Sequence, residues 1–139
     1  MATVFVDTAA WIALLNHSDD LHERAMQVMQ TLRAQNTRLL TTEFVLLEVA
    51  DALSAPGVRS RTVAFLDGLR RLPLLETLPF ADELHAAGWV LYRNRPDKDW
   101  GLTDCISFAC MADHQIAQAF TSDHHFEQAG FSILLPLHH

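Results

Sequence analysis

Short apolar runs alternate with helical patterns along the whole chain, and this alternation limits the possible folds more than any other feature. Val4-Phe5-Val6 is a β-branched and aromatic run, and apolar residues recur at helical spacing from Thr8 onward. Further strands are predicted at residues 38–40, 74–75, 117–121 and 131–135. Helices are predicted over residues 21–35, 44–53, 59–71, 81–92 and 104–114. This alternation favours an α/β protein with a parallel sheet covered on both faces.

The organisation of the chain indicates a single domain spanning residues 1–139. There is no internal repeat, no low-complexity tract and no long linker rich in Pro, Gly or Ser. A chain of this length buries on the order of 70% of the surface that its unfolded form exposes. It therefore needs no disulfide, and we expect Cys105 and Cys110 to be buried thiols in a reducing compartment.

No segment has the character of a membrane span or a signal peptide. The longest uninterrupted apolar stretch, residues 9–15, is far shorter than the ~20 residues that span a bilayer. The first four residues carry no basic side chain. We therefore expect a cytoplasmic protein with no membrane contact. The terminal pair His138-His139 also fits the remnant of an affinity tag, and the sequence leaves its origin open.

The charge balance is acidic, with 17 Asp and Glu against 10 Lys and Arg and a formal net charge of −7. Proteins that hold nucleic acid by a basic surface need clustered Lys and Arg to neutralise phosphates. The composition therefore argues against such a protein. An enzyme that acts on phosphates through a metal ion stays open.

Four carboxylates are expected to converge at one edge of the sheet. Binding sites of open α/β sheets lie beyond the carboxyl ends of the strands, where Asp7 and Asp123 each follow a predicted strand. Glu48 lies one turn after Phe44 in an apolar helix, so its carboxylate faces inward. Asp104 lies in the first turn of a helix, where the helix dipole stabilises negative charge and keeps the carboxylate ionised.

Such a group of carboxylates predicts a divalent cation. Four negative charges at short range repel one another, and a cation bound through oxygen ligands is the usual resolution. Magnesium or manganese fits best, because the acids lack the Cys and His ligands that zinc recruits. Such a site deprotonates and aims a water molecule at phosphorus while the metal offsets charge on the phosphoryl oxygens.

Each acid also has a purely structural interpretation. Asp7 fits a helix N-cap, Asp104 a first-turn acid, and Asp123 the start of a turn or the cap of a short helix. Glu48 is the hardest to explain in this way, because an inward-facing Glu in so apolar a helix needs a partner. His124-His125 lie closest to these acids, but their spacing matches no pair of helical metal ligands.

Four segments resemble the sequence motifs of PIN-domain ribonucleases. Residues 4–11 and 46–49 resemble the first two motifs, and residues 100–108 and 120–131 resemble the third and fourth motifs of the VapC toxin branch. The resemblance implies a three-layer α/β/α fold with a central, mostly parallel sheet of four to five strands. It also implies a magnesium- or manganese-dependent endoribonuclease that leaves 5′-phosphate and 3′-hydroxyl ends, and a cognate antitoxin protein that blocks the site.

The resemblance assigns roles to particular residues. The family's four acidic positions match Asp7, Glu48, Asp104 and Asp123. Asp7 and Asp104 are then the principal metal ligands, and the other two acids complete the catalytic pocket directly or through water. Thr8 and Thr103 match small hydroxyl positions that orient ligands or water by hydrogen bonds.

Two further expectations concern the substrate and the assembly. Arg93, Arg95 and Lys98, the only lysine, lie in one polar loop and are expected to contact an RNA backbone; solvated side chains are the plainer alternative. The apolar helices between Ala9 and Leu53 carry more hydrophobic surface than one sheet face needs. We therefore predict a homodimer.

Two other functions compete with the nuclease. A phosphoacceptor signalling domain also gathers carboxylates and magnesium at the strand ends of a parallel sheet. It needs a lysine near the acids, whereas Lys98 precedes the third acidic motif in a loop. A PIN-like module that binds RNA or protein without catalysis is the second alternative, and the presence of all four acids counts against it.

Overall fold

The computed structural model describes residues 2–137, so His138-His139 lie outside the described residues. Its centre is a five-stranded sheet in the order β3-β2-β1-β4-β5. Each pair of neighbouring strands is parallel. The strands are β1 (Thr3–Val6), β2 (Arg38–Thr42), β3 (Leu75–Leu78), β4 (Gln118–Phe120) and β5 (Ser132–Ile133). The predicted parallel sheet is confirmed.

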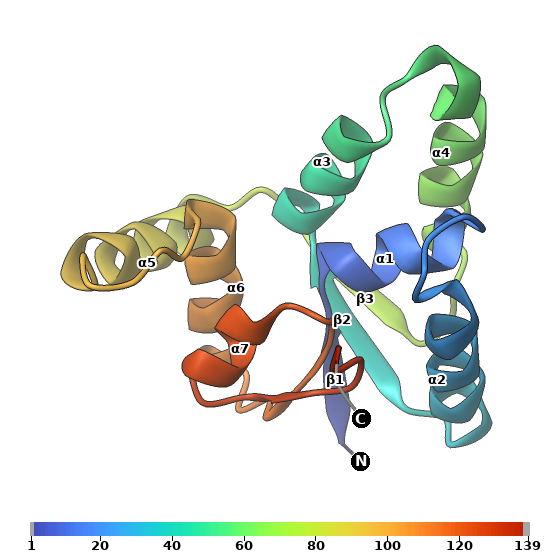
Figure 1. Ribbon diagram of the computed structural model, residues 1–139. Helices are drawn as coiled ribbons and strands as arrows, with labels where there is room; N and C mark the ends of the chain where they lie inside the picture. The colour runs from blue at the N-terminus through green and yellow to red at the C-terminus, as the bar shows by residue number, and fades with distance from the viewer. Residues whose placement is uncertain (1, 138–139) are drawn as a thin grey trace.

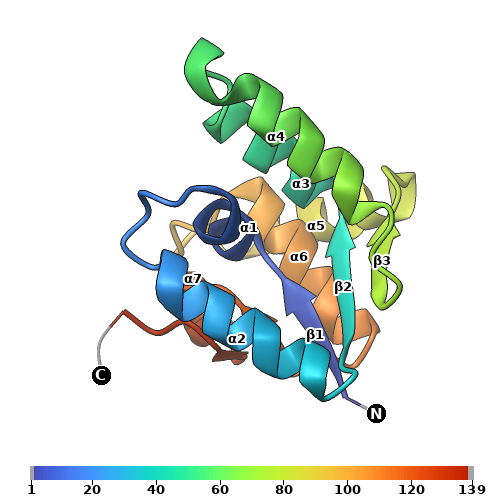
Figure 2. The same cartoon turned by 90° about the vertical axis from the view of Figure 1, so that its right-hand side faces the viewer.

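Helices cover both faces of this sheet and complete three layers. They are α1 (Thr8–Leu15), α2 (His22–Ala34), α3 (Glu43–Ala52), α4 (Pro56–Leu69), α5 (Asp82–Asn94), α6 (Leu102–Asp113) and α7 (His124–Gln128). Helices α1, α2 and α4 lie on one side of the sheet, and α5, α6 and α7 lie on the other (Figures 1 and 2). The expected α/β/α fold class is therefore confirmed.

Helix α1 is almost completely buried, because nearly all of its side chains are apolar and it packs against α2, α3 and α4. Its indole side chain, Trp11, is 0% exposed. The Trp11 Nε1–H donates to the Thr41 hydroxyl at 3.3 Å, and that hydroxyl donates to the Val6 carbonyl at 2.8 Å. These two hydrogen bonds attach α1 to the carboxyl ends of β1 and β2.

Several helix ends differ from the predicted ones. Helix α4 begins at Pro56 instead of residue 59, because proline suits the first turn of a helix. Helix α6 begins at Leu102, after the N-cap Gly101, instead of at residue 104, so Thr103 lies inside the first turn. Helix α5 extends to Asn94 and includes Arg93, which was expected in a loop.

Cys105 and Cys110 lie on α6 as free, buried thiols, as expected. Between residues 2 and 137, no helix has the combination of length and apolar composition that crossing a membrane requires.

The close approach of α5 and α6 depends on a glycine. A Cβ atom at Gly88 would collide with the Ile106 side chain and would lie 2.8 Å from the Ile106 Cα and N atoms. Real Cβ atoms do not approach backbone atoms so closely, and the backbone of α6 cannot swing aside as a flexible side chain can. Gly88 therefore sets the spacing of α5, which projects away from the sheet in Figure 1.

We expect Gly88→Ala to lower the free energy of unfolding by about 1–3 kcal/mol, the usual penalty of overpacking. The gain in helix propensity, about 1 kcal/mol, offsets only part of it. Gly68→Ala is the matched control, because Gly68 is also helical and a Cβ there meets no atom within 4 Å. Urea denaturation should show one destabilised and one stabilised variant. Equal stability of Gly88→Ala and the wild type would contradict the packing argument.

Candidate active site

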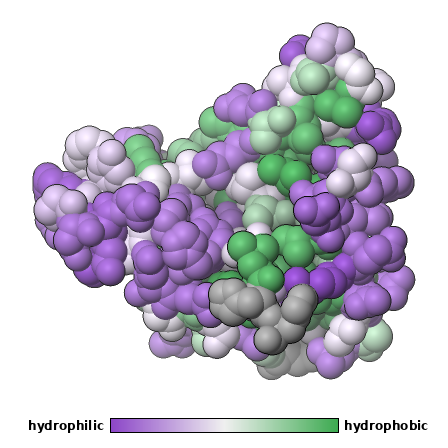
Figure 3. Space-filling view, in the orientation of Figure 1, coloured by the Kyte–Doolittle hydropathy of each residue, from purple (hydrophilic) through white to green (hydrophobic). Residues whose placement is uncertain are grey.

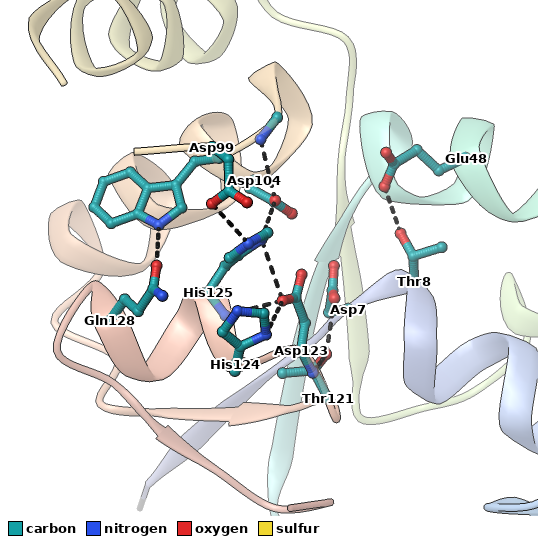
Figure 4. Close-up of polar contacts among 12 residues, drawn as sticks. Asp7, Thr8, Glu48, Asp99, Asp104, Thr121, Asp123, His124, His125 and Gln128 are labelled. Atoms are coloured by element: carbon teal, nitrogen blue, oxygen red, sulfur yellow. Dashed lines mark hydrogen bonds and ion pairs between the residues drawn. The ribbon is translucent and has the colours of Figure 1, made fainter. Parts of the chain in front are cut away.

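Two aspartates reach the same edge of the sheet from neighbouring strands. Asp7 follows β1 directly, and Asp123 lies three residues after β4. Strands β1 and β4 are parallel, with Val6 paired to Phe120, and the Asp7 N–H extends this ladder by donating to the Phe120 carbonyl at 3.1 Å. Parallel strands end at one edge, and Figure 4 shows the two carboxylates close together there.

Asp7 is buried, with 4% of its surface exposed. Burial raises the pKa of this carboxyl from 3.8 to about 7, against the opposing effect of polar contacts with the Thr8 backbone N–H and the Thr121 hydroxyl. The Thr121 hydroxyl donates to Asp7 Oδ2 at 2.9 Å. Asp7 occupies the N-cap position of α1 but its side chain makes no capping hydrogen bond. Its structural interpretation as the N-cap therefore holds for its position and does not account for its carboxylate.

Asp104 approaches the same edge from the first turn of α6, and its Oδ2 accepts the Gly101 N–H at 3.3 Å. Burial raises the pKa of this carboxyl above its ordinary value, and the charges of Asp123 and Glu48 raise it further. We expected the helix dipole to keep Asp104 ionised, but burial and neighbouring charge outweigh the Gly101 N–H.

The four acids form one electrostatic group. The charges of Asp104 and Asp123 raise the pKa of Asp7, and those of Asp123 and Glu48 raise the pKa of Asp104. Each pair that interacts in this way is destabilised when both members are ionised. The arrangement therefore favours a positive charge among the carboxylates.

Asp123 has the capping role that its structural interpretation predicted. It is the N-cap of α7, and its Oδ1 accepts the His125 backbone N–H at 2.9 Å. Its own N–H donates to the Thr121 hydroxyl at 3.1 Å. Within residues 2–137 its second oxygen accepts no hydrogen bond, so capping leaves one oxygen available to a ligand.

Glu48 lies across from Asp104 and Asp123, on α3 (Figure 4). Its carboxylate is partly buried, and the Thr8 hydroxyl donates to Glu48 Oε1 at 2.7 Å. This hydrogen bond is the partner that an inward-facing Glu was expected to need. Thr8 thus fixes the direction of one acid, in line with its expected orienting role. Thr103 makes no side-chain hydrogen bond within the described chain, so its expected role stays a prediction.

Sequence reasoning missed the part played by His125. Its Nε2 lies 3.2 Å from Asp99 Oδ1, and its Nδ1 lies 3.3 Å from Asp123 Oδ1 and 3.4 Å from Asp104 Oδ2. The ring is largely buried, and neither nitrogen meets hydrogen-bond geometry within the described residues. The sequence analysis placed His124-His125 closest to the acids and judged them by their spacing alone, whereas α7 brings the His125 side chain beside Asp99, Asp104 and Asp123.

Thr121 was also missed, although its position offered a signal. It follows β4 directly, at the edge where sites are expected, and its hydroxyl contacts both Asp7 and the Asp123 backbone. A polar residue that is 0% exposed at such a position indicates a hydrogen-bonding role. His125 offered a weaker signal, since only the short helix α7 brings it into the group.

The donor atoms of the group suit a hard divalent cation. Carboxylate oxygens from Asp7, Asp104, Asp123 and Glu48 are the ligands that magnesium and manganese prefer. Within the described residues, the ligand atoms of Asp123, His124 and His125 also lie within 4.8 Å of one another, so two imidazole rings stand beside these oxygens. The oxygen donors suit a hard divalent cation, and the rings of His124 and His125 add nitrogens of the kind that zinc also accepts.

The three predicted RNA contacts lie apart from the four acids. Arg93, Arg95 and Lys98 line a separate pocket between the end of α5 and the start of α6. Asp99 and Gly101 belong to the same pocket wall and also touch the acidic group, through His125 and Asp104 respectively. The pocket and the acids are therefore neighbours that share one loop.

Comparison with known proteins agrees with the fold. The model of the PIN domain family matches residues 4–132. The 23S rRNA-specific endonuclease VapC20 of Mycobacterium tuberculosis is 28% identical over 134 residues, which is 96% of this chain and 98% of the relative. The crystal structure of M. tuberculosis VapC20, described as a sarcin-ricin loop cleaving toxin, superposes with a TM-score of 0.79 at 26% identity over 92% of this chain and 95% of that one.

More distant structures share the fold. VapBC2 from Rickettsia felis, bound to a DNA fragment from the promoter, gives a TM-score of 0.70 at 16% identity and covers 94% of this chain and 96% of that chain. FitAcB from Neisseria gonorrhoeae gives 0.68 at 17% identity, covering 94% and 95%. The chain belongs to the PIN domain family. The expected resemblance to its VapC branch is confirmed by the similarity to VapC20 along nearly the whole chain.

The raised pKa of Asp7 predicts a pH-dependent stability. In the folded chain this carboxyl binds its proton up to about pH 7, whereas its ordinary pKa is 3.8. The folded state therefore binds more protons between these values, and stability falls as pH rises through the window, by up to roughly 4 kcal/mol. We expect Asp7→Asn to be more stable than the wild type above pH 7 in EDTA, and the difference to shrink toward pH 4.

Thermal unfolding of both proteins at pH 4.5, 6 and 8 measures this difference. Because other titrating groups are common to both proteins, the comparison isolates Asp7. Magnesium at pH 8 should raise the melting temperature of the wild type more than that of the variant. Parallel pH profiles of the two proteins would show that Asp7 does not carry the effect.

Proposed function

We propose that this protein is an endoribonuclease that hydrolyses RNA phosphodiester bonds and serves as the toxin of a toxin–antitoxin pair. The single observation that carries the proposal is the gathering of Asp7, Asp104 and Asp123 at the carboxyl edge of a PIN-domain sheet, with Glu48 facing them from α3. The similarity to VapC20, whose name describes a 23S rRNA-specific endonuclease, supports RNA as the substrate. We propose a cytoplasmic location, because a substrate of this kind is found there.

We further propose Mg²⁺ or Mn²⁺ as the cofactor, held principally by Asp7 and Asp104. Glu48 and Asp123 complete the site directly or through water. When bound, the ion supplies a nucleophile by lowering the pKa of a water molecule and offsets charge on the phosphoryl oxygens. The electrostatic coupling of the four acids supports this assignment, because a cation relieves the repulsion between them.

The side chains of the protein position the reactants. Thr121 and Thr8 hold the carboxylates of Asp7 and Glu48 in fixed directions, so little reorganisation accompanies the reaction. In the hydrolysis, the water oxygen bonds to phosphorus, the bond to the 3′ oxygen breaks, and a proton passes to that oxygen. The products are the 5′-phosphate and 3′-hydroxyl ends that the family resemblance implies.

A protein inhibitor is the expected partner. The VapC resemblance implies a cognate antitoxin, and similarity to VapC20 and the VapBC2 fold supports this proposal. The competing function is a PIN-like module that binds RNA or protein without cutting. The raised pKa of the buried Asp7 carboxyl favours the enzyme, because carboxyls with strongly shifted pKa values cluster at catalytic sites.

The proposal predicts metal-dependent RNA cleavage that single isosteric changes abolish. Asp7→Asn and Asp104→Asn keep the side-chain shape and remove a ligand charge, so we expect at least a hundredfold loss of cleavage, about 2.7 kcal/mol of transition-state stabilisation. The measurement is cleavage of a mixed-sequence RNA panel with magnesium, manganese, zinc or EDTA. Asp51→Asn is the control, since Asp51 is exposed on the same helix as Glu48.

Circular dichroism must show that all variants are folded. Cleavage by the wild type that survives in both variants would remove these residues from the site. A wild type that neither cuts the panel nor binds metal by calorimetry would favour the silent module.

The predicted homodimer is retained as a proposal, with its surface revised. Much of the apolar surface expected to mediate it belongs to α1, which is buried within the chain. The exposed apolar side chains instead include Leu47 on α3 and Val63 on α4, 52% and 54% exposed. Figure 3 shows apolar residues gathered over α1, α3 and α4, and polar residues over α5, α6 and α7.

Light scattering at micromolar concentration should therefore give twice the mass of the 15.6 kDa chain. Leu47→Glu should shift the equilibrium toward the monomer, because a charge on an apolar contact surface is costly to bury. Met26→Glu on α2 is the control. A monomeric wild type would rule out the dimer.

A further inference from the structure

The pocket between α5 and α6 is lined by three basic side chains, Arg93, Arg95 and Lys98. Its volume is about 610 Å³, and its walls come from the last turn of α5, the loop that follows, and the first turn of α6. Residues 93–98 contribute three of the ten Lys and Arg side chains of a chain whose net charge is −7. Asp97 and Asp99 lie in the same stretch, so residues 93–99 carry a net charge of +1, and any local attraction for a polyanion comes from the cations that no carboxylate pairs.

The three cations are not equivalent. Arg95 is engaged within its loop, because its Nε and Nη2 donate to the two carboxylate oxygens of Asp97 at 3.0 and 2.9 Å, and its guanidinium lies 5.2 Å from the centre of the Trp100 ring. The Arg93 side chain makes no ion pair or hydrogen bond with residues 2–137. Neither does the Lys98 ammonium, which lies 5.9 Å from the centre of the Trp100 ring. Arg95 therefore shapes the loop, and Arg93 and Lys98 offer their charges to a ligand.

An exposed aromatic pair stands at the rim of the pocket. Tyr92 lines the pocket, and its ring is stacked on that of Trp89, with centroids 5.6 Å apart and an angle of 25° between the planes. The two side chains are 44% and 46% exposed, whereas Trp11 and Trp100 are buried. Aromatic rings beside cations are the features on which single-stranded RNA stacks its bases and places its phosphates.

The pocket adjoins the acids that would cut such a strand. Asp99 lies in its wall and approaches His125, whose other nitrogen is 3.4 Å from Asp104. Gly101 also lies in the wall, and its N–H donates to Asp104. The segment from the last turn of α5 to the first turn of α6 therefore carries the cations at one end and Asp104 at the other.

We propose that this pocket binds a nucleotide of the single-stranded RNA substrate next to the scissile phosphate, with Arg93 and Lys98 on its phosphates and Tyr92 stacked on its base. The inference rests on the proposed function for the identity of the ligand. An acidic protein segment would also satisfy the two cations. It would not use the stacked rings or the neighbouring carboxylates, so RNA is favoured.

Binding of fluorescently labelled single-stranded RNA, measured by anisotropy in the Asp7→Asn background with magnesium, tests the pocket without requiring cleavage. Arg93→Gln with Lys98→Gln should weaken binding about tenfold or more at 100 mM salt and make its salt dependence shallower, since two phosphate contacts are lost. Arg61→Gln with Arg71→Gln is the control, because both side chains are exposed on or after α4 and the same charge is removed.

The aromatic contact has its own matched pair of variants. Tyr92→Leu should weaken binding about tenfold, and Tyr92→Phe, which keeps the ring, should bind as the parent does. In the cleaving enzyme, the Arg93 and Lys98 changes should raise KM and leave kcat within about threefold, as expected of groups that hold a flanking nucleotide.

The outcomes separate this inference from the proposed function. Normal cleavage by all pocket variants would support the nuclease function and contradict the proposal that the pocket binds RNA. RNA binding that depends on Arg93, Lys98 and Tyr92 in a protein that never cuts RNA upholds the pocket and overturns the nuclease. Equal losses in the Arg61 and Arg71 control would show an effect of net charge and overturn the inference. So would variants that lose only self-association, since the surface would then be a contact between protein chains.

Discussion

The buried carboxyl group of Asp7 is the constraint on which the rest of the site depends. It sits at the end of the central strand with 4% of its surface exposed, so it has lost most of the hydration that stabilises a carboxylate. The Thr121 hydroxyl compensates in part, and the charges of Asp104 and Asp123 act in the opposite direction. The fold thus maintains an unfavourable interaction that a proton or a cation relieves, and it does so next to the place where a phosphate would bind.

The surrounding core supplies the rigidity that this arrangement requires. Strand β1 is central in the sheet, with β2 and β4 on either side, so the position of Asp7 is determined from both edges. Trp11 and Thr41 join α1 to the same ends of the strands by buried hydrogen bonds. A carboxyl group held on such a frame cannot move out to solvent when it ionises. The energy of ionisation therefore appears as a raised pKa instead of a local rearrangement.

Sequence reasoning predicted those parts of the molecule that depend on local pattern. The alternation of strands and helices predicted the parallel sheet. Asp7 and Asp123 were found because binding sites of such sheets lie beyond the carboxyl ends of the strands, and both residues follow a strand in the sequence. The contacts of His125 could not be predicted, since they depend on how one short helix, α7, sits against α6. The helix dipole argument for Asp104 was incomplete for a similar reason: burial comes from other segments of the chain and outweighs the local N–H. Thr121 follows β4 directly, so the same argument could have identified it, but the sequence analysis did not single it out.

The separation of cations from carboxylates connects the chemistry to the choice of substrate. An Arg or Lys placed among the four acids would neutralise them and occupy the position proposed for the metal ion. The structure instead keeps Arg95 paired with Asp97, and it leaves Arg93 and Lys98 one loop away from the acids. A ligand that contacts both the metal position at the acids and the pocket with Arg93 and Lys98 needs two neighbouring negative groups. The backbone of RNA repeats a phosphate at each nucleotide, so a single strand can meet the cation at the acids and the free side chains at the same time. An acidic protein can therefore bind a polyanion at two local sites, the metal ion proposed at the acids and the side chains of Arg93 and Lys98. Neither site requires a basic surface.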